Sequence, residues 1–296
     1  MIGITIGDPK GIGPEIAAKA FAELSCKKNP KIRLYGPKHL LKSVENGLVP
    51  SFAGISDHEA GLIAKEALDN ALDDASKGNL RAIVTCPVNK FRMQTVIPGF
   101  LGHTEYIANA LNAKEPTMVF IGERDGFRPF IISIATRHLP LSKVSKAISA
   151  SSIALAIERT NEAARRYLCK DSPSIAVLGL NPHAGENGSL GCEEKEFLEP
   201  AIKKLHLRGI NCHGPFSGDS IISENYDAFV AMYHDQGMIP AKLLCATACV
   251  NVTMGLPFIR TSPGHGTAEN IAGKGIARID GLIAATEIAA KLSINA

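Results

Sequence analysis

The length, composition and charge of the chain exclude several classes of protein. Its 296 residues, 45% hydrophobic and 21% charged, are typical of a globular protein and suffice for two α/β domains. A net charge of +3 without any Lys- or Arg-rich run argues against a nucleic-acid partner. No apolar run approaches the roughly 18 residues that cross a bilayer, so no membrane contact is expected.

Short apolar runs alternate with amphipathic stretches along the chain. The apolar runs predict strands at 2–7, 31–35, 82–86, 118–122, 129–135, 174–180, 227–233 and 250–253. Amphipathic patterns predict helices, for example over 58–77 and 150–168. Strands that are apolar throughout are typical of a sheet buried on both faces. The alternation therefore predicts an α/β fold on a largely parallel or mixed sheet, with a domain division that the chain crosses twice.

The loop GDPKGIGPE, residues 7–15, follows the first predicted strand and leads into a helix. A Gly-rich turn at a helix start suits a phosphate group. However, the third glycine of the dinucleotide fingerprint would fall at Ile16, and the ending of a P-loop is absent. A tight turn with Pro14 at the helix start explains the loop equally well.

The segment GHTEYIANAL, residues 102–111, carries a second candidate site. Thr104 is expected to cap the following helix, which would place His103 just outside the helix N-terminus. Anionic groups bind favourably at such a position. A His-Thr pair alone, however, indicates no more than a cap.

Three predicted strands end in a histidine, namely His138, His183 and His234. In open α/β sheets, ligands bind outside the carboxyl ends of the strands. Three imidazoles delivered there could bind one cation and leave open positions for a substrate, although each alone could be a structural residue. Asp219 is a candidate for a carboxylate that orients one of the histidines.

A fourth segment runs from Lys242 through Asn251 and Arg260 to the loop GHGTAENIAGKGIA, residues 264–277. Lys and Arg suit a phosphate and a carboxylate, although surface Lys and Arg are usually only solvated. The stretch 265–273 offers backbone amides, a hydroxyl and small residues before a helix. This composition suits a nucleotide that lies against a loop.

The seven cysteines are widely spaced and form no CxxC pair. This usage predicts free thiols in a reducing compartment. The start of the chain, MIGITIGDPKG, lacks the basic and apolar regions of a signal peptide. A cytoplasmic protein is therefore expected.

Seven motifs in a fixed order resemble the 4-hydroxythreonine-4-phosphate dehydrogenase family and span essentially the whole chain. They are GDPKGIGPE, TCPVNK, GHTEYIA, ATRHLPL, LNPHAGENG, YHDQGMIPAK and VNVTMGLPFIRTSPGHGTAENIAGKG. The last also resembles the cofactor loop of isopropylmalate and isocitrate dehydrogenases. The resemblance implies two α/β/α domains with a cleft between them, and not a Rossmann fold. We expect residues 1–115 plus 255–296 to form the domain with the cofactor loop, and 116–254 the domain with the histidines.

The resemblance also implies residue roles. The implied metal ligands are His138, His183 and His234; the substrate-binding residues are His103, Thr104, Lys242, Asn251 and Arg260; the cofactor loop contributes His265, Gly266, Thr267, Ala268 and Asn270. Three nitrogen ligands suit zinc, cobalt or nickel, and magnesium or manganese would serve if substrate oxygens complete the shell. The general base stays open between Lys242 and a metal-bound water relayed through Asp219.

The implied reaction is the NAD- or NADP-dependent oxidation of the C3 hydroxyl of 4-phosphooxy-L-threonine. Loss of carbon dioxide then gives 3-amino-2-oxopropyl phosphate for vitamin B6 synthesis. The resemblance further implies a homodimer with each active site near the subunit interface. A related dehydrogenase of 4-phospho-D-threonate or D-erythronate in sugar-acid catabolism, a metal-dependent hydrolase or aldolase, and a non-catalytic binding protein are the alternatives.

The sequence departs from the family pattern at several positions. The region before His103 is shorter, and Lys10 occupies a position that is usually small. Gly264 stands where the family usually has Asp, and Asn270 where it has an acidic residue. An acidic residue at the latter position favours NAD by repelling a 2′-phosphate. Neutral Asn270 therefore predicts weaker discrimination between NAD and NADP.

Overall fold

The computed structural model divides the chain into two compact units. The residues it describes are 1–26, 30–38, 42, 52, 54–124, 128–245 and 249–294. Unit 1 comprises Met1–Pro116 and Val250–Ile294, and unit 2 comprises Thr117–Cys249. Unit 2 is therefore a continuous insertion between the two segments of unit 1. Within the described ranges, no helix combines the length and the apolarity needed to cross a membrane.

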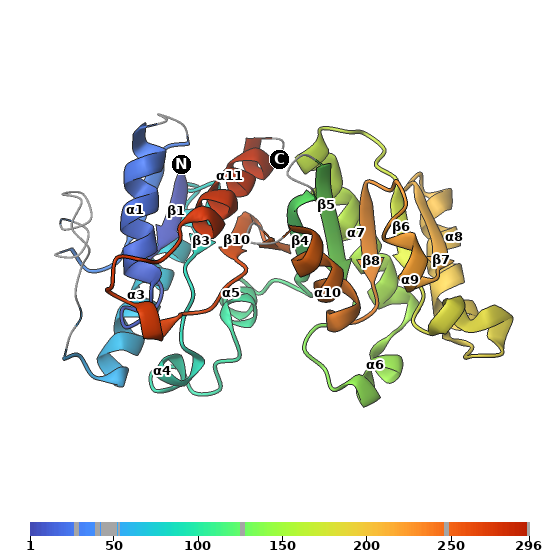
Figure 1. Cartoon of the computed structure of the whole chain (residues 1–296), viewed down its shortest axis with the longest axis horizontal. Helices are drawn as coiled ribbons and strands as arrows, with labels where there is room; N and C mark the ends of the chain where they lie inside the picture. The colour runs from blue at the N-terminus through green and yellow to red at the C-terminus, as the bar shows by residue number, and fades with distance from the viewer. Residues whose placement is uncertain are drawn as a thin grey trace. The chain divides into compact units, whose positions relative to one another are not determined.

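Unit 1 is built on a sheet in the order β2-β1-β3-β10-β9, of which β1, β3 and β10 are labelled in Figure 1. Its strands are β1 (Ile2–Thr5), β2 (Ile32–Tyr35), β3 (Ala82–Thr85), β9 (Val250–Met254) and β10 (Ile259–Pro263). All pairs are parallel except β9 with β10, which is antiparallel. The helices of unit 1 are α1 (Gly13–Cys26), α3 (Asp57–Ser76), α4 (Lys90–Gln94), α5 (His103–Ala110) and α11 (Asp280–Ile294).

The boundary expected after residue 254 differs from the observed one. Val250–Met254 belongs to unit 1, because β9 pairs with β10 along four successive residue pairs, from Arg260 opposite Thr253 to Pro263 opposite Val250. The chain therefore returns to unit 1 before β9, not after it.

Unit 2 is built on a sheet in the order β4-β5-β8-β6-β7. Its strands are β4 (Thr117–Arg124), β5 (Arg128–Ile134), β6 (Ile175–Leu178), β7 (Cys212–Phe216) and β8 (Ala228–Ala231). β4 and β5 are antiparallel, whereas β5, β8, β6 and β7 are parallel. The helices of unit 2 are α6 (Leu141–Ala147), α7 (Ala150–Leu168), α8 (Glu199–Leu207), α9 (Gly218–Ile221) and α10 (His234–Cys245).

Local chemistry explains where the two predicted helices begin. α3 starts after Ser56, whose hydroxyl accepts from the Glu59 amide while the Glu59 carboxylate accepts from the Ser56 amide. α7 starts after Ser149 with the same reciprocal pattern to Ser152. Such capping boxes satisfy backbone donors that the first helical turn leaves unpaired. Both helices and all eight predicted strands are present, and the mixed α/β fold is confirmed.

Two strands were not predicted, and neither is a continuous apolar run. β10 contains Arg260 and two hydroxyl residues, and it ends at a proline. β7 has the sequence CHGPF, in which glycine and proline are typical of turns. Both strands therefore lack the apolar pattern that marks the other eight.

Candidate functional site

Arg260 lies almost completely buried in unit 1, although its side chain is charged. It is 3% exposed and lies on β10 opposite Thr253 of β9. Its Nη2 donates to Thr85 Oγ1 at 2.6 Å, and its Nη1 donates to Thr253 Oγ1 at 3.1 Å. Among the described residues it forms no ion pair, and its Nε has no hydrogen-bond partner.

Burial of this guanidinium without a paired carboxylate is energetically unfavourable. Burial lowers the pKa of Arg260 to about 10, and the more distant charge of Glu105 only partly opposes that shift. Arg260 is still charged at neutral pH. The side chain is therefore prepared for an anionic ligand, which would supply the missing counter-charge.

His103 and Thr104 lie at the start of α5, but not as expected. The helix begins at His103, with Gly102 as its N-cap and no side-chain cap. The prediction that Thr104 caps the helix is therefore wrong: it lies one residue inside the first turn and is 6% exposed. Burial, and then the charge of Arg260, lower the pKa of the half-buried His103 to about 3. His103 is thus uncharged at neutral pH and lies within electrostatic reach of Arg260.

Asn251 adds a second unsatisfied polar group in the same unit. It lies on β9 two residues before Thr253, so the two side chains point to the same face of the sheet. In the described part of the chain, its buried Oδ1 has no hydrogen-bond partner. A donor on Arg260 and an acceptor on Asn251 are therefore both left for a ligand. We call His103, Thr104, Asn251 and Arg260 the anion site.

The fifth predicted substrate residue, Lys242, belongs to unit 2. It lies in the last turn of α10 and is exposed. Its charge lowers the pKa of Cys249, although the larger cause is a hydrogen bond from Cys245. The role of Lys242 toward a substrate remains a prediction.

The predicted cofactor loop, residues 264–277, packs against the loop that follows β1. The Ile12 amide donates to the Thr267 carbonyl at 2.9 Å. Gly11 lies so close that a Cβ there would come within 2.9 Å of the Thr267 oxygen. The first loop therefore supports the cofactor loop. From His265 to Asn270 the cofactor loop itself is exposed or half-buried, and Ala268 has a left-handed φ of 42°.

The three predicted metal-binding histidines follow three adjacent parallel strands of unit 2. β8 pairs with β5 on one side and with β6 on the other. His138 comes after β5, His183 after β6, and His234 directly after β8 at the start of α10. The carboxyl ends of these strands share one edge of the sheet, as the sequence pattern requires for a common site. We call these three residues the histidine site.

Two of the three imidazoles lie close together. The ring centroids of His138 and His234 are 5.2 Å apart. Two imidazoles that bind one tetrahedral ion with bonds of about 2.0–2.1 Å have centroids about 5 Å apart. His234 Nδ1 contacts Asp235 Oδ1 at 2.7 Å, which fixes the ring and directs Nε2 away from that carboxylate. This pair therefore fits a metal ion.

His183 lies in a left-handed turn. From His183 to Asn187, all five residues have φ between 42° and 78°. Non-glycine residues rarely adopt this conformation, so the turn is strained. No group of three His, Cys, Asp or Glu side chains in the described ranges is placed to hold a metal ion. His183 as the third ligand therefore stays a prediction, and binding would require its turn to adjust.

The buried carboxylate of Glu194 holds the left-handed turn. It is 2% exposed, and its Oε1 accepts from the Leu180 and Asn181 amides at 2.9 and 2.8 Å. Its Oε2 accepts from Asn181 Nδ2 at 3.0 Å and lies 2.7 Å from where a Cβ on Gly185 would be. Glu194 and Asp235 support the histidines, yet sequence reasoning assigned neither this role. Only the adjacency of Asp235 to His234 could have signalled it.

Asp219, the carboxylate predicted to orient one of the histidines, lies at the start of α9. Its Oδ1 accepts from Ser217 Oγ at 2.6 Å. That hydrogen bond is the main cause that lowers the pKa of Asp219, and the charge of His183 contributes further. Asp219 therefore stays a carboxylate at neutral pH.

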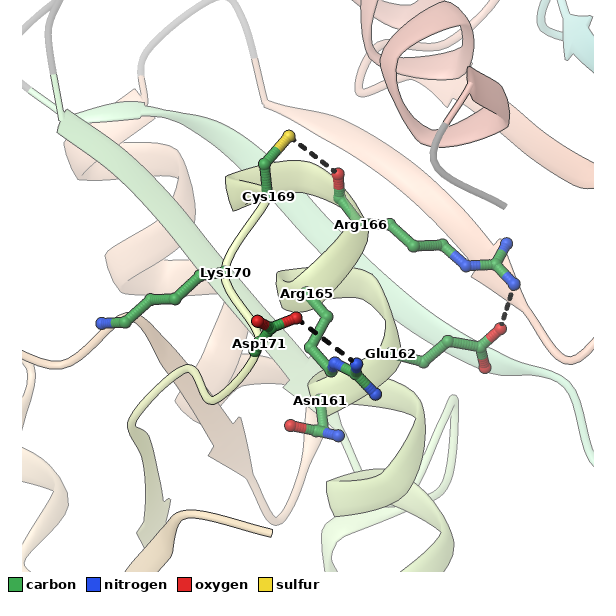
Figure 2. A pocket seen from close by; sticks show the side chains of 7 residues that line it. All are labelled: Asn161, Glu162, Arg165, Arg166, Cys169, Lys170 and Asp171. Atoms are coloured by element: carbon green, nitrogen blue, oxygen red, sulfur yellow. Dashed lines mark hydrogen bonds and ion pairs between the residues drawn. The ribbon is translucent and has the colours of Figure 1, made fainter.

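Two surface hollows of unit 2 contain no predicted site residue. One, of about 520 Å³, is lined by Asn161, Glu162, Arg165, Arg166, Cys169, Lys170 and Asp171 (Figure 2). Its charged side chains already form ion pairs: Arg166 with Glu162 at 2.8 Å, Arg165 with Asp171 at 3.9 Å, and Lys170 with Asp227 outside the hollow at 2.5 Å. The other, of about 550 Å³, lies between α8 and β7. Neither hollow competes with the anion site or the histidine site.

Comparisons with known proteins agree with one another. Residues 6–289 match the family model of the pyridoxal phosphate biosynthetic protein PdxA. A 4-hydroxythreonine-4-phosphate dehydrogenase from Sulfurihydrogenibium sp. (strain YO3AOP1) is 37% identical, over 97% of each chain. The crystal structure of a 4-hydroxythreonine-4-phosphate dehydrogenase from Klebsiella pneumoniae is 32% identical with a TM-score of 0.83, over 99% of each chain. Isocitrate dehydrogenase from Methylococcus capsulatus, 17% identical with a TM-score of 0.54 over 97% of this chain and 84% of its own, shares the fold.

Proposed function

The chain belongs to the PdxA family of pyridoxal phosphate biosynthetic proteins, and from this premise we propose that it oxidises 4-phosphooxy-L-threonine. The reaction would transfer hydride from C3 to NAD or NADP, and decarboxylation would yield 3-amino-2-oxopropyl phosphate. The observation that carries this proposal is the buried guanidinium of Arg260, which has no ion pair with any residue that the structure describes. An anionic substrate would supply the negative charge that this guanidinium lacks.

The anion site provides complementary groups for one end of this substrate. Arg260 offers its unsatisfied Nε, and Asn251 offers its unsatisfied amide oxygen. Neutral His103 donates or accepts a hydrogen bond without adding a charge, because its pKa is lowered to about 3. Lys242 is proposed to serve the substrate as a further point charge. The phosphate and the carboxylate of the substrate supply the matching negative charges.

The histidine site is proposed to hold one divalent ion. His138 and His234 already have the spacing of two ligands, and His183 would be the third. Zinc, cobalt or nickel match nitrogen ligands, and magnesium or manganese match if substrate oxygens take part. When bound, the ion would supply a Lewis acid for the C3 hydroxyl and the dinucleotide a hydride acceptor. The protein's part is to hold these groups in line and to remove the hydroxyl proton.

Two residues are proposed for that proton transfer. Asp219 is a carboxylate at neutral pH, since its hydrogen bond from Ser217 lowers its pKa, and it could relay a proton through water. The other candidate is Lys242, which would accept the proton directly. If the Asp219 carboxylate relays the proton, kcat of the wild type should fall as the pH decreases and the carboxylate is protonated. Loss of this pH dependence in Asp219→Asn would favour the carboxylate relay.

The loop from His265 to Asn270 is proposed to bind the dinucleotide. It offers the Thr267 hydroxyl, small residues and exposed backbone. Asn270 lacks the negative charge that would repel a 2′-phosphate, so both NAD and NADP are proposed as cofactors. Neither cofactor is favoured by a charged contact at this position.

A homodimer in the cytoplasm is the proposed state of the protein. Unit 2 exposes several large apolar side chains: Leu139 (43%), Leu141 (71%), Ile239 (60%) and Leu243 (78%). Ile239 and Leu243 are one helical turn apart on α10, so they form an apolar stripe on its exposed side. Exposed apolar patches of this kind are typical of subunit interfaces.

A metal-replete assay at 340 nm, the absorbance of the reduced dinucleotide, tests the proposal directly. Turnover is compared for 4-phosphooxy-L-threonine, 4-phospho-D-threonate and 4-phospho-D-erythronate, each with NAD and with NADP. We expect the amino acid phosphate to give the highest kcat/KM. A phospho-sugar acid as the better substrate would move the protein to sugar-acid catabolism. If none of the three substrates reduced NAD or NADP, the proposed dehydrogenase activity would be refuted.

A further inference from the structure

Three carboxylates converge on Arg92 of α4, whose side chain is only 10% exposed. Its Nη1 donates to Asp8 at 2.7 Å, its Nε to Asp57 at 2.8 Å, and its Nη2 to Glu269 at 2.7 Å. Each nitrogen therefore serves a different carboxylate. Only a guanidinium has donors that diverge in this way.

The three carboxylates come from three separate segments of unit 1. Asp8 lies in the loop after β1, Asp57 begins α3, and Glu269 lies in the proposed dinucleotide loop. Lys10 also binds Asp57, at 2.8 Å, and thereby balances part of the negative charge. Arg92 thus ties the dinucleotide loop to two segments that belong to the body of the unit.

Glu269 is fixed at both of its oxygens. Oε2 accepts from Arg92, and Oε1 accepts from Asn89 Nδ2 at 2.8 Å. The hydrogen bond from Arg92, followed by that from Asn89, lowers the pKa of Glu269, so it stays ionised. Its neighbours in the chain are Ala268, with its left-handed φ, and Asn270. Holding Glu269 therefore holds two residues proposed to meet the dinucleotide.

The far end of the loop is anchored by another buried carboxylate. Glu15 is 1% exposed and accepts from the Ala277 amide at 2.9 Å and the Gly275 amide at 3.3 Å. Lys19 bridges Glu15 and the Gly275 carbonyl, each at 2.8 Å. The loop between these anchors has little regular structure, so its shape depends on side-chain contacts at both ends.

We infer that Arg92 is a positioning residue for the dinucleotide, which it serves by holding Glu269 and so the conformation of residues 268–270. The inference rests on the proposed function, in which this loop binds NAD or NADP. A loop ordered in advance does not lose further conformational freedom when its ligand binds. Loss of Arg92 should therefore weaken dinucleotide binding and leave binding of the phosphorylated acid unchanged.

The test compares Arg92→Met with Arg33→Met as a matched control. Arg33 forms a single ion pair with Asp74 in the same unit and is 46% exposed. Two readouts are measured on the full-length protein: the rate of trypsin cleavage after Lys274, which is exposed in the loop, and the KM values of dinucleotide and acid.

For Arg92→Met we expect faster cleavage after Lys274 and a dinucleotide KM raised about tenfold, the effect of one charge-assisted hydrogen bond. The KM of the acid should change less than about twofold, and Arg33→Met should change neither readout. If Arg92→Met folds poorly, Glu269→Gln, which keeps the other two ion pairs of Arg92, should raise the dinucleotide KM in the same direction.

Unchanged dinucleotide KM in both variants would overturn the role of Arg92. The proposed function fails in a different way: wild-type Lys274 would then gain no protection from trypsin when NAD or NADP is added. Protection in the wild type, together with an unaffected KM in Arg92→Met, would refute the inference alone.

Discussion

The anion site of unit 1 and the histidine site of unit 2 are held by different means. Arg260 is fixed by two hydroxyls on neighbouring strands, so its position follows from the sheet itself. His183 instead lies in a strained left-handed turn, and His138 is exposed in the segment after its strand. Side chains on strands are held in position without a ligand, whereas side chains on loops are positioned less precisely. The two sites should therefore respond differently to mutation.

The largest effect is expected at Arg260. Arg260→Met should lower kcat/KM about a thousandfold, because a buried charged contact to the substrate is lost. The Tm should stay constant or rise, since an unpaired buried charge is replaced by an apolar side chain. Inorganic phosphate should raise the Tm of the wild type but not of the variant. An Arg260→Met protein that keeps normal kcat/KM would show that the site binds no substrate anion.

Mutation of the histidine site should act by weakening the binding of the proposed metal ion. His138→Ala, His183→Ala and His234→Ala should each lower turnover more than about a hundredfold, beyond the loss typical of outer-shell partners. Far-UV circular dichroism should remain unchanged, and metal analysis should show weakened binding. His206→Ala provides a control on the same unit. Near-normal activity in His183→Ala would remove it from the ligand set.

Substitution of Glu194 tests the carboxylate that supports the turn of His183, and leaves the three histidines in place. Glu194→Leu leaves the partly buried Leu180 and Asn181 amides without their acceptor, which should lower the free energy of unfolding by about 2–4 kcal/mol. Urea unfolding measures this loss, and metal titration should show weaker binding because the turn is released. Glu199→Leu, an exposed change on α8, should shift stability by less than about 0.5 kcal/mol. Equal stability of both variants would contradict the assigned role of Glu194.

The choice of cofactor tests the loop of unit 1. The wild type should prefer NAD over NADP by less than about a hundredfold, a ratio that needs about 2.7 kcal/mol of selective interaction. Asn270→Asp should raise that preference about tenfold, because its carboxylate repels the 2′-phosphate. Steady-state kinetics with both cofactors gives the ratio. An unchanged ratio in Asn270→Asp would place residue 270 away from the ribose.

The smallest effect concerns pH. The pKa of His103 is lowered from 6.5 to about 3 in the folded protein, so only the unfolded chain binds a proton between these values. Stability is therefore full above pH 6.5 and falls as the pH decreases toward 3. For this partly exposed ring, the loss between pH 7 and pH 5 is expected to be about 1 kcal/mol. His103→Asn should remove that loss in urea unfolding, whereas His58→Asn, an exposed change, should retain it.

The sequence predicts the frame of the fold better than its site contacts. Eight strands are visible because each is a run of apolar residues. β10 escaped detection because it carries Arg260, the charged residue that the anion site needs. The cap at Thr104 was misplaced because α5 starts two residues earlier, after Gly102. At Arg260 the requirement proposed for anion binding thus overrides the local apolar pattern.

Contacts between distant residues are not encoded in local patterns. The three histidines are predictable because each follows an apolar strand, and the order of the strands then brings them to one edge. Arg92 and Glu269 are 177 residues apart, and nothing in the spacing of either signals their ion pair. Glu194 reaches back 14 residues to hold the turn of His183, and its sequence context is an ordinary charged run.

The insertion of unit 2 into unit 1 has a consequence for protein synthesis. Thr85 and Arg260 are 175 residues apart, and the whole of unit 2 is translated between them. At about 5–20 residues per second, the ribosome takes about 10–35 s to cover that distance. Throughout that interval, the nascent edge of β3 lacks its partner β10, and the full sequence of unit 2 is available before β10 is made. Unit 2 can thus fold first during translation, and the anion site is completed only as the last segment leaves the ribosome.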